Sequence, residues 1–293
     1  AAAGSLATAA RLAPDDAELR LLLATALYRA GETAAAAGEL EAASRLAPGD
    51  PRVAALLEKV RREAAAEQGH DRAASEHFTV SFEGGGTSAQ AGYLVGLLLE
   101  EAYHAVGDGL GYRPVRRIHA VLYPAQQFRD VTRSPAWAGA LYDGKIRIPV
   151  GGLTDKSELL ARVVRHEYAH ALVHELSGGR APVWLNEGVA MLSEGPVDRQ
   201  LLDAFRAYVR RGGRVASLRQ LEGTFARLGP AEARLAYAHA LAATEQLAAA
   251  HGLHAVRRLL ERLGEGRPFE DAFRETFYTS YDEFDRAWAA ALR

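Results

Sequence analysis

Residues 159–172 read LLARVVRHEYAHAL, and they combine a helical apolar period with two histidines and a glutamate. The four-residue spacing places His166 and His170 on one face of a helix, about one turn apart. Glu167 directly follows the first histidine. Apolar residues recur at helical spacing and predict a buried stripe along this helix. They are Leu159, Leu160, Val163, Val164, Ala171 and Leu172.

Two imidazoles one turn apart can bind the same zinc ion, and a neighbouring glutamate can accept a proton from water activated by that metal. The chain has no cysteine, so a metal site must be built from histidine and carboxylate. Catalytic zinc takes three protein ligands and leaves its fourth position open. We therefore expect one Zn²⁺ per chain, with Glu167 as the general base.

A third ligand is expected downstream, where residues 184–191 read WLNEGVAM. Glu187 lies near the start of a second helix that follows Pro182 and can pack antiparallel to the first. Its carboxylate would then face the two histidines. His174 is a competing candidate, but histidines at i, i+4 and i+8 form a row about 12 Å long, which cannot close around one ion.

Two more residues of the second helix belong to the neighbourhood of these ligands. Asn186 directly precedes Glu187, and we expect it among the contacts around the ligand side chains. Glu194 lies seven residues after Glu187 on the same helical face. It is either a hydrogen-bond partner of a ligand histidine or a solvated residue.

The HExxH motif at 166–170, the turn that follows and the W-L-N-E-G-x-A motif at 184–190 resemble the gluzincin clan of zinc metallopeptidases. The similarity is to its compact peptidase-MA-like members and covers residues 77–293. It implies a thermolysin-like zincin domain in which the two histidines and Glu187 hold zinc and Glu167 is the general base.

The same resemblance implies a group that stabilises the oxyanion of the transition state. The stretch LAYAHAL, residues 235–241, is similar to the helix that carries a transition-state tyrosine in the clan's aminopeptidases. Tyr237 is the candidate, with His239 as runner-up. The alternative is that Tyr237 is a core aromatic residue, because tyrosine at an apolar helical spacing is common.

In this clan the substrate backbone pairs with an edge strand upstream of the zinc helix. The best match here is Gly144, Lys145, Ile146, Arg147 and Ile148. The clan's aminopeptidases carry a G-A-M-E-N stretch whose glutamate holds the substrate amine, whereas this chain has GALYD at 139–143. Tyr142 replaces that glutamate, which favours an endopeptidase over an aminopeptidase, although Asp143 could substitute.

The N-terminal region repeats internally, since RLAPDD at 11–16 returns as RLAPGD at 45–50. The offset of 34 residues is the tetratricopeptide period, and the segment resembles a tetratricopeptide (TPR) repeat. One repeat is complete, from Ala17 to about Asp50. Because such arrays need about three units to bury a core, we expect a piece of a longer array that offers a face to a protein partner.

The expected fold class is α+β, with all-α TPR hairpins followed by a small mixed sheet and a mainly helical C-terminal half. Alternating or apolar runs predict strands at 77–82, 118–123 and 145–149, and a helix over 88–107. C-terminal aromatic residues are expected in the core: Phe269, Phe273, Phe277, Tyr281, Phe284 and Trp288. The predicted divisions are a TPR-like region 1–68, a linker 69–76 and a peptidase domain 77–293, with a sheet part 77–150 and a helical part 151–293.

Composition excludes several function classes. The 293 residues carry 35 Lys+Arg against 37 Asp+Glu, so the basic excess typical of nucleic-acid binding is absent. No apolar run reaches 18 residues, which predicts no membrane span. The only methionine is Met191, so we expect a trimmed chain. Bacterial members of this type are often exported, which favours an exported or periplasmic bacterial protein.

The sequence thus predicts a zinc-dependent peptidase that hydrolyses peptide bonds of a peptide or protein substrate through a metal-activated water, with a TPR module for protein partners. One alternative is a catalytically decayed zincin that acts as a binding scaffold. The presence of both histidines, Glu167 and Glu187 opposes decay. Another alternative is a zinc hydrolase of a non-peptide substrate, because the same chemistry serves other bonds.

Overall fold

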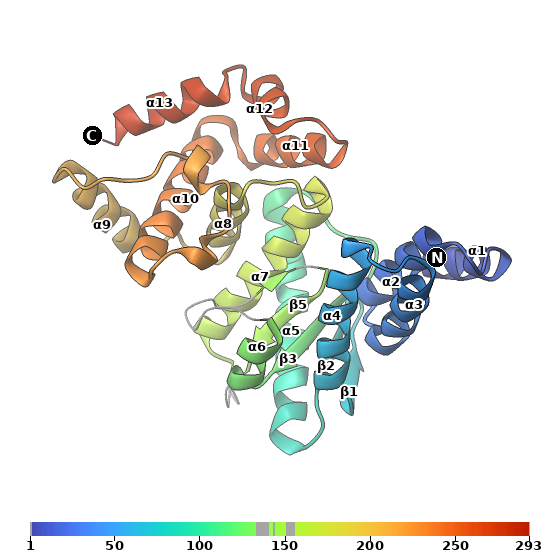
Figure 1. Cartoon of the computed structure of the whole chain (residues 1–293). Coiled ribbons are helices and arrows are strands. Elements are labelled where there is room, and N and C mark those ends of the chain that lie inside the picture. Colours follow the sequence, from blue (N-terminus) through green and yellow to red (C-terminus); the bar gives the residue numbers. More distant parts are fainter. Residues whose placement is uncertain (1, 133–140, 143, 151–155, 293) are drawn as a thin grey trace. The chain divides into compact units, whose positions relative to one another are not determined.

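The structure is a computed structural model, and it describes residues 2–132, 141–142, 144–150 and 156–292 (Figure 1). The chain divides into two compact units, each assembled from three stretches. The first comprises 1–96, 116–133 and 144–154. The second comprises 97–115, 134–143 and 155–293. The predicted α+β class is confirmed, with many helices and a small mixed sheet.

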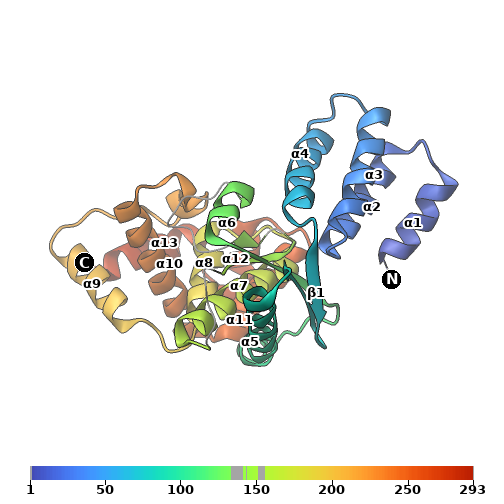
Figure 2. The ribbon, with the colours of Figure 1, turned by 90° about the horizontal axis from the view of Figure 1, so that it is seen from below.

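Four helices open the first unit and lie side by side as repeat hairpins (Figures 1 and 2). They are α1 (Ala2–Leu12), α2 (Ala17–Arg29), α3 (Thr33–Leu46) and α4 (Pro51–Ala66). Asp16 caps α2 by accepting a hydrogen bond of 2.9 Å from the amide of Leu19. The apolar positions that define the repeat are buried between the helices: Ala24, Ala36, Leu40, Ala43, Leu57 and Val60.

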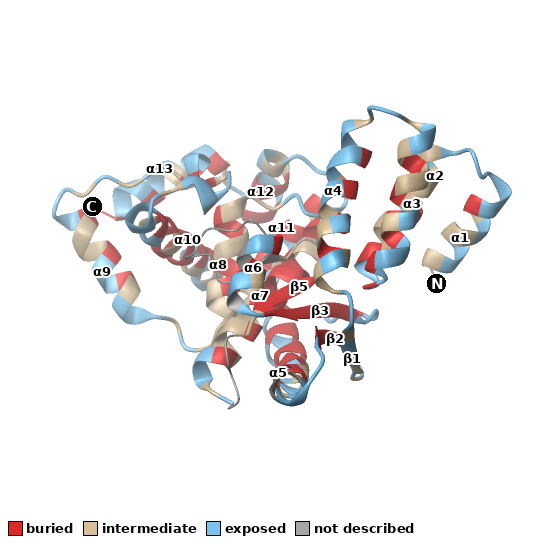
Figure 3. Cartoon of the chain, turned by 60° about the horizontal axis from the view of Figure 1, so that its bottom comes forward, coloured by how far each residue is buried: buried red, intermediate tan, exposed pale blue. Residues whose placement is uncertain are grey.

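The sheet of the first unit has the strand order β1-β2-β3-β5. Strand β1 pairs antiparallel with β2, whereas β2, β3 and β5 are parallel, and β3 and β5 are buried (Figure 3). The three predicted strands are present within a residue or two. The strands are β1 (His70–Ala74), β2 (Phe78–Glu83), β3 (Ile118–Tyr123) and β5 (Ile146–Pro149).

Two elements of this unit were not predicted. Strand β1 lies inside the predicted linker 69–76, because its HDRAA sequence is too polar to be recognised before its pairing partner is known. Helix α6 (Ala125–Thr132) directly follows Pro124. Proline is well tolerated just before the first turn of a helix, and its carbonyl accepts a hydrogen bond from the amide of Phe128.

Helix α5 (Gly86–Leu110) extends the predicted helix 88–107 at both ends. Its first turns pack on the sheet of the first unit through Gly92. A Cβ at Gly92 would lie 2.3 Å from the ring of Phe82, so only glycine allows this approach. Gly31, between α2 and α3, has a φ of +80°, and a Cβ there would lie 2.3 Å from the imidazole of His119. Both glycines therefore permit close packing against the sheet.

Buried ion pairs join the repeat helices to strand β5. The Arg147 guanidinium donates hydrogen bonds of 2.9 and 3.0 Å to the Glu63 carboxylate of α4. Arg147 and the Glu63 carboxylate also both contact the hydroxyl of Tyr28 on α2. The side chains of Glu63 and Arg147 are only 2% and 1% exposed, so neither charge is stabilised by water.

Lys145 makes the second set of these contacts. Its ammonium donates to Thr33 Oγ1 at 2.6 Å and to both oxygens of Glu67 at 3.1 and 3.2 Å. Burial would raise the pKa of Glu67, but Lys145, Thr33 and Tyr123 hold it below its ordinary value. Two carboxylates therefore balance two cations, and α4 is fixed to β5 by a buried neutral network.

The predicted linker 69–76 separates the TPR-like sequence pattern from the peptidase pattern. This division of the sequence remains a prediction. The compact units divide the chain differently, because the repeat helices and the sheet share one unit. The reason is the network of buried ion pairs between the repeat helices and β5, which local sequence patterns do not predict.

The second unit is mainly helical. Trp184 is fully buried and stacks parallel to Tyr281, with ring centroids 6.2 Å apart. Of the aromatic residues expected in the core near the C-terminus, four are buried, whereas Phe269 and Phe284 are only partly buried and pack on the ring of Phe273. Its elements are β4 (Leu141–Tyr142), α7 (Glu158–Ser177), α8 (Val183–Ser193), α9 (Arg199–Arg210), η1 (Arg219–Leu221), η2 (Phe225–Arg227), α10 (Pro230–His251), α11 (Leu253–Gly264), α12 (Phe269–Phe277) and α13 (Tyr281–Ala291). Among the described residues, no helix is long and apolar enough to cross a membrane.

We predict that Glu63→Gln destabilises the chain by about 3 kcal/mol or more, because it leaves the buried Arg147 cation without its counter-ion. Urea-induced unfolding followed by circular dichroism measures this change. Glu41→Gln is the matched control, since the Arg61–Glu41 pair is exposed (59% and 41%) and should change stability by less than about 1 kcal/mol. Equal effects of the two substitutions would contradict the importance of the buried network.

Candidate metal centre

Helix α7 carries the HExxH residues, and local capping fixes both of its ends. Ser157 accepts a hydrogen bond from the Leu160 amide at 3.1 Å, and Gly178 ends the helix with a φ of +60°. Most of the predicted apolar stripe is buried. Leu159 is the exception at 72% exposure, because Leu160 occupies the inward position of that turn. The stripe turns Glu167 and His170 into the interior, where they are 3% and 7% exposed.

Helix α8 presents Glu187 toward α7, and its position depends on the next residue, Gly188. A Cβ at Gly188 would lie 2.0 Å from Thr244 Oγ1 and 2.5 Å from the carbonyl oxygen of Ala240. Only glycine therefore allows α8 to pack this closely against α10. The glycine of the WLNEG motif has a packing role, and it places the preceding carboxylate between α7 and α10.

Three side chains converge at this position. The Nε2 atoms of His166 and His170 are 3.0 Å apart, and Oε2 of Glu187 is 3.5 Å from each of them. The circle through these three atoms has a radius of about 1.9 Å, slightly less than a zinc–ligand distance of about 2.0–2.1 Å. The spacing of the three atoms fits zinc, which His166, His170 and Glu187 would hold together.

The outer nitrogen of each imidazole is engaged elsewhere. Nδ1 of His166 donates to Oε1 of Glu194 at 2.9 Å, and Nδ1 of His170 donates to Oδ1 of Asn186 at 3.0 Å. The Nε2 atoms of the two rings face each other across the site. Oε2 of Glu187 is buried and has no hydrogen-bond partner among the described residues. Two ring nitrogens and a carboxylate oxygen therefore meet at one point, and these are ligand types that bind zinc.

The electrostatic environment also favours positive charge here. Burial by itself would lower the pKa of His166, but Glu187 and Glu194 raise it to about 10. Burial would raise the pKa of Glu187, but His170 and His166 hold it well below its ordinary value. Both shifts have one physical cause, namely attraction between carboxylates and cationic groups in a space with little water.

Glu167 and Tyr237 lie beside this cluster. Glu167 has a ligand-type oxygen within 4.8 Å of nitrogens of His166 and His170. Burial raises the pKa of Glu167, and its Oε2 has no hydrogen-bond partner among the residues that the structure describes. Burial also raises the pKa of Tyr237, with further contributions from the charges of Glu187 and Glu167. Tyr237 therefore belongs to the electrostatic neighbourhood of the site.

The runner-up to Tyr237 lies elsewhere in the second unit. His239 is 3% exposed, and its Nε2 accepts a hydrogen bond of 2.7 Å from the indole of Trp288. Its ring also packs on Phe205. Residues 237 and 239 are separated by about 200° around a helix, so only one of them can face α8. The structure thus favours Tyr237 over His239 as the candidate.

His174 contacts an aromatic ring instead of the histidine pair. Its ring meets that of Tyr142 nearly at a right angle, with centroids 5.2 Å apart. Tyr142 belongs to β4, which packs against α7 within the second unit. The other residues of the GALYD stretch that matter for amine recognition, Gly139, Ala140 and Asp143, lie outside the described residues.

The predicted substrate strand, residues 144–148, largely coincides with β5. The side chains of Lys145 and Arg147 are occupied by the buried pairs with α4, which leaves them unable to contact a substrate. Ile146 and Ile148 are fully buried. Backbone pairing of a substrate along this segment remains a prediction. Strand β4 is a second candidate, because it lies against the helix that carries the histidines.

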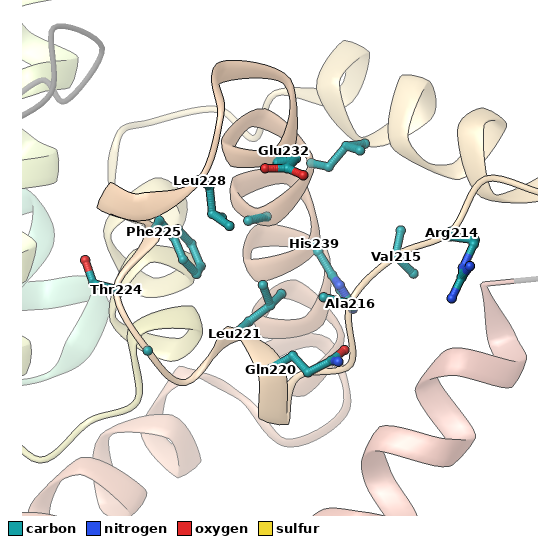
Figure 4. A pocket seen from close by; sticks show the side chains of 13 residues that line it. Arg214, Val215, Ala216, Gln220, Leu221, Thr224, Phe225, Leu228, Glu232 and His239 are labelled. Atoms are coloured by element: carbon teal, nitrogen blue, oxygen red, sulfur yellow. The ribbon is translucent and has the colours of Figure 1, made fainter.

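A cavity of about 360 Å³ lies on a different face of α10 from the metal centre (Figure 4). The α10 residues that line this cavity are spaced i, i+3, i+4 and i+7, so they lie on one face of the helix. Those residues are Glu232, Leu235, Ala236 and His239. Ala240 and Thr244, which contact α8, lie on another face. The cavity therefore does not contain the convergent ligand set.

Sequence reasoning missed one member of the site, Arg162. Its guanidinium donates to Oε2 of Glu194 at 2.8 and 3.3 Å. The available signal was its position, since it precedes His166 by four residues and shares its helical face. The sequence left open whether Glu194 bonds one of the histidines or is solvated. Its contact with Nδ1 of His166 shows that it bonds a histidine.

Comparison with known proteins agrees with this arrangement. Residues 102–293, more than half of the chain, match the Peptidase MA superfamily, and residues 1–60 match the tetratricopeptide repeat. A search of curated proteins and a search of solved structures each find no match. The chain therefore belongs to the Peptidase MA superfamily and carries a tetratricopeptide repeat region at its N-terminal side.

Proposed function

We propose that the chain is a zinc-dependent peptidase in which His166, His170 and Glu187 hold the metal. The observation that carries this proposal is the convergence of two imidazole nitrogens and a carboxylate oxygen at 3.0 and 3.5 Å. When bound, zinc would lower the pKa of water and polarise a substrate carbonyl. Superfamily membership supports peptide hydrolysis as the reaction.

Glu167 is the proposed general base. It follows a ligand histidine on the same helix, and burial raises its pKa toward the range in which a carboxylate accepts a proton efficiently near neutral pH. The same group can then return the proton to the leaving amine. No other carboxylate in the centre is free for this role, because Glu187 faces both imidazoles and Glu194 is bonded to His166 and Arg162.

Tyr237 is the proposed donor to the oxyanion. The carboxylates of Glu187 and Glu167 help to keep its hydroxyl protonated, so that it can donate a hydrogen bond to developing negative charge. Its ring is supported by the edge of Phe225, with centroids 5.3 Å apart.

The proposed substrate is a peptide or protein cut at internal bonds. The position that would hold a substrate amine in aminopeptidases is Tyr142, whose ring packs on His174 and carries no negative charge at neutral pH. A positively charged substrate terminus therefore gains nothing from this residue.

The tetratricopeptide region indicates protein–protein interaction, and we propose that it binds a protein partner. The faces of α2 and α4 that carry Tyr28 and Glu63 are already covered by β5 of the same chain. A partner would therefore use the other faces of these helices. Deleting residues 1–68 is a poor test, because it would leave the buried cations of Lys145 and Arg147 unpaired.

We predict that the purified protein holds one zinc per chain and cleaves peptides, and that Glu167→Gln keeps the metal but lowers kcat at least about 100-fold. Elemental analysis and a peptide library measure the two quantities. Glu158→Gln is the control, because Glu158 lies on the same helix but is exposed and pairs with Arg165. Wild type without zinc would contradict the metal site. Wild type with zinc but no peptide cleavage would indicate a decayed scaffold, or a non-peptide hydrolase if esters were cleaved.

We predict that Tyr237→Phe lowers kcat by about 100- to 1,000-fold with little change in KM, because the hydroxyl acts only on the transition-state charge. Steady-state kinetics on one peptide tests this, with zinc content measured in parallel. Tyr93→Phe serves as the control, since Tyr93 is 67% exposed. An unchanged kcat would reduce Tyr237 to a packing residue.

We predict that acetylating the N-terminus of a good peptide substrate changes kcat/KM by less than about threefold, because Tyr142 replaces the glutamate that would hold a free amine. Paired free and acetylated peptides, followed by mass spectrometry, provide the measurement. A loss of more than about 100-fold on acetylation would instead indicate an aminopeptidase and would direct attention to Asp143.

A further inference from the structure

The carboxylate of Glu194 is shared between two side chains of α7. One oxygen, Oε1, accepts from Nδ1 of His166 at 2.9 Å. The other, Oε2, accepts from the guanidinium of Arg162 at 2.8 Å. The three side chains form a row in which the guanidinium lies outermost and the imidazole innermost. Each oxygen has its own partner, so rotation of the carboxylate breaks both contacts.

The backbone positions of these residues are also fixed. Arg162 precedes His166 by four residues, so both project from one face of α7 about one turn apart. Glu194 follows the last residue of α8 and caps that helix. The row therefore spans the end of α8 and the middle of α7. Without the guanidinium, the only described contact that holds Glu194 over α7 is its bond to the imidazole.

We propose that Arg162 is a positioning residue of the metal centre, which acts through Glu194 to set the orientation and tautomer of His166. This rests on the proposed function, in which Nε2 of His166 is a zinc ligand. The Glu194 side chain is 18% exposed, so water can compete for it when its outer partner is lost. The His166 ring then loses the acceptor that keeps Nδ1 protonated and Nε2 directed at the metal.

A purely structural role gives a different expectation. If Arg162 only tied α7 to α8, its loss would lower thermal stability and leave the imidazole and the metal affinity unchanged. Side chains around metal ligands typically contribute 10- to 100-fold to metal affinity. Arg162 is one contact further out than Glu194, so we expect about a 3- to 10-fold weaker zinc affinity for Arg162→Gln and a larger loss for Glu194→Gln.

The test measures two properties of the full chain. Competition with a chromophoric chelator gives the zinc affinity, and NMR of ¹⁵N-histidine-labelled protein without metal detects the hydrogen-bonded Nδ1 proton of His166. In Arg162→Gln we expect weaker zinc binding and loss of that proton signal through exchange with water. Arg162→Lys should restore most of both, because an ammonium can still bond Oε2 of Glu194.

A double substitution identifies the route of the effect. If Arg162 acts through Glu194, the pair Arg162→Gln with Glu194→Gln binds zinc no more weakly than Glu194→Gln alone. Arg165→Gln is the matched control, because Arg165 lies on the same helix beside His166 and bonds Glu158 instead. It should keep the proton signal and a zinc affinity within about twofold of wild type.

Two results would overturn the proposal: an unchanged His166 proton signal in Arg162→Gln, or additive losses of zinc affinity in the double variant. Failure of the proposed function is a separate outcome. If wild type bound no zinc, the metal assignment would fall, while the proton signal would still decide whether Arg162 orients His166 through Glu194. A fall in melting temperature with both other quantities unchanged would leave only the structural tie and refute the proposal.

Discussion

The approach of two imidazole nitrogens is the constraint around which the second unit is arranged. Nε2 of His166 and Nε2 of His170 are 3.0 Å apart, and each ring has its proton on the far side, bonded to Glu194 or Asn186. The Glu187 carboxylate adds an oxygen from another helix, 3.5 Å from each ring nitrogen. Positive charge at this point, on an imidazole or on a bound metal, is therefore favoured by the surrounding carboxylates.

The contacts that produce this arrangement are ordinary packing contacts. Gly188 lets α8 approach α10 because no Cβ separates their backbones, and Trp184 is stacked on Tyr281 one turn earlier in α8. Glu187 lies between these two anchors. The chemistry of the site is therefore held by residues that take no part in it, and the spacing of the WLNEG motif reflects packing as much as ligation.

In the first unit, neutral ion pairs replace an apolar contact between the repeat helices and the sheet. Arg147 lies in β5 and Lys145 directly precedes it, while Glu63 lies in α4 and Glu67 caps that helix, so opposite charges are matched in number. A buried ion pair gives little net stability but penalises any arrangement that leaves one charge alone. The network therefore specifies how the repeat joins the sheet, and it makes the repeat region part of a compact unit.

The sequence by itself determined the helix periodicity, the 34-residue repeat, the three main strands and the candidates His166, His170, Glu187 and Glu167, because each depends on local spacing along the chain. Strand β1 and the partner of Arg147 were undetermined, since pairing and charge neutralisation depend on segments far apart in sequence. The tertiary structure alone showed that His239 is bonded to Trp288 and that Arg162 reaches Glu194. Those contacts depend on which helix faces meet, and local periodicity leaves that open.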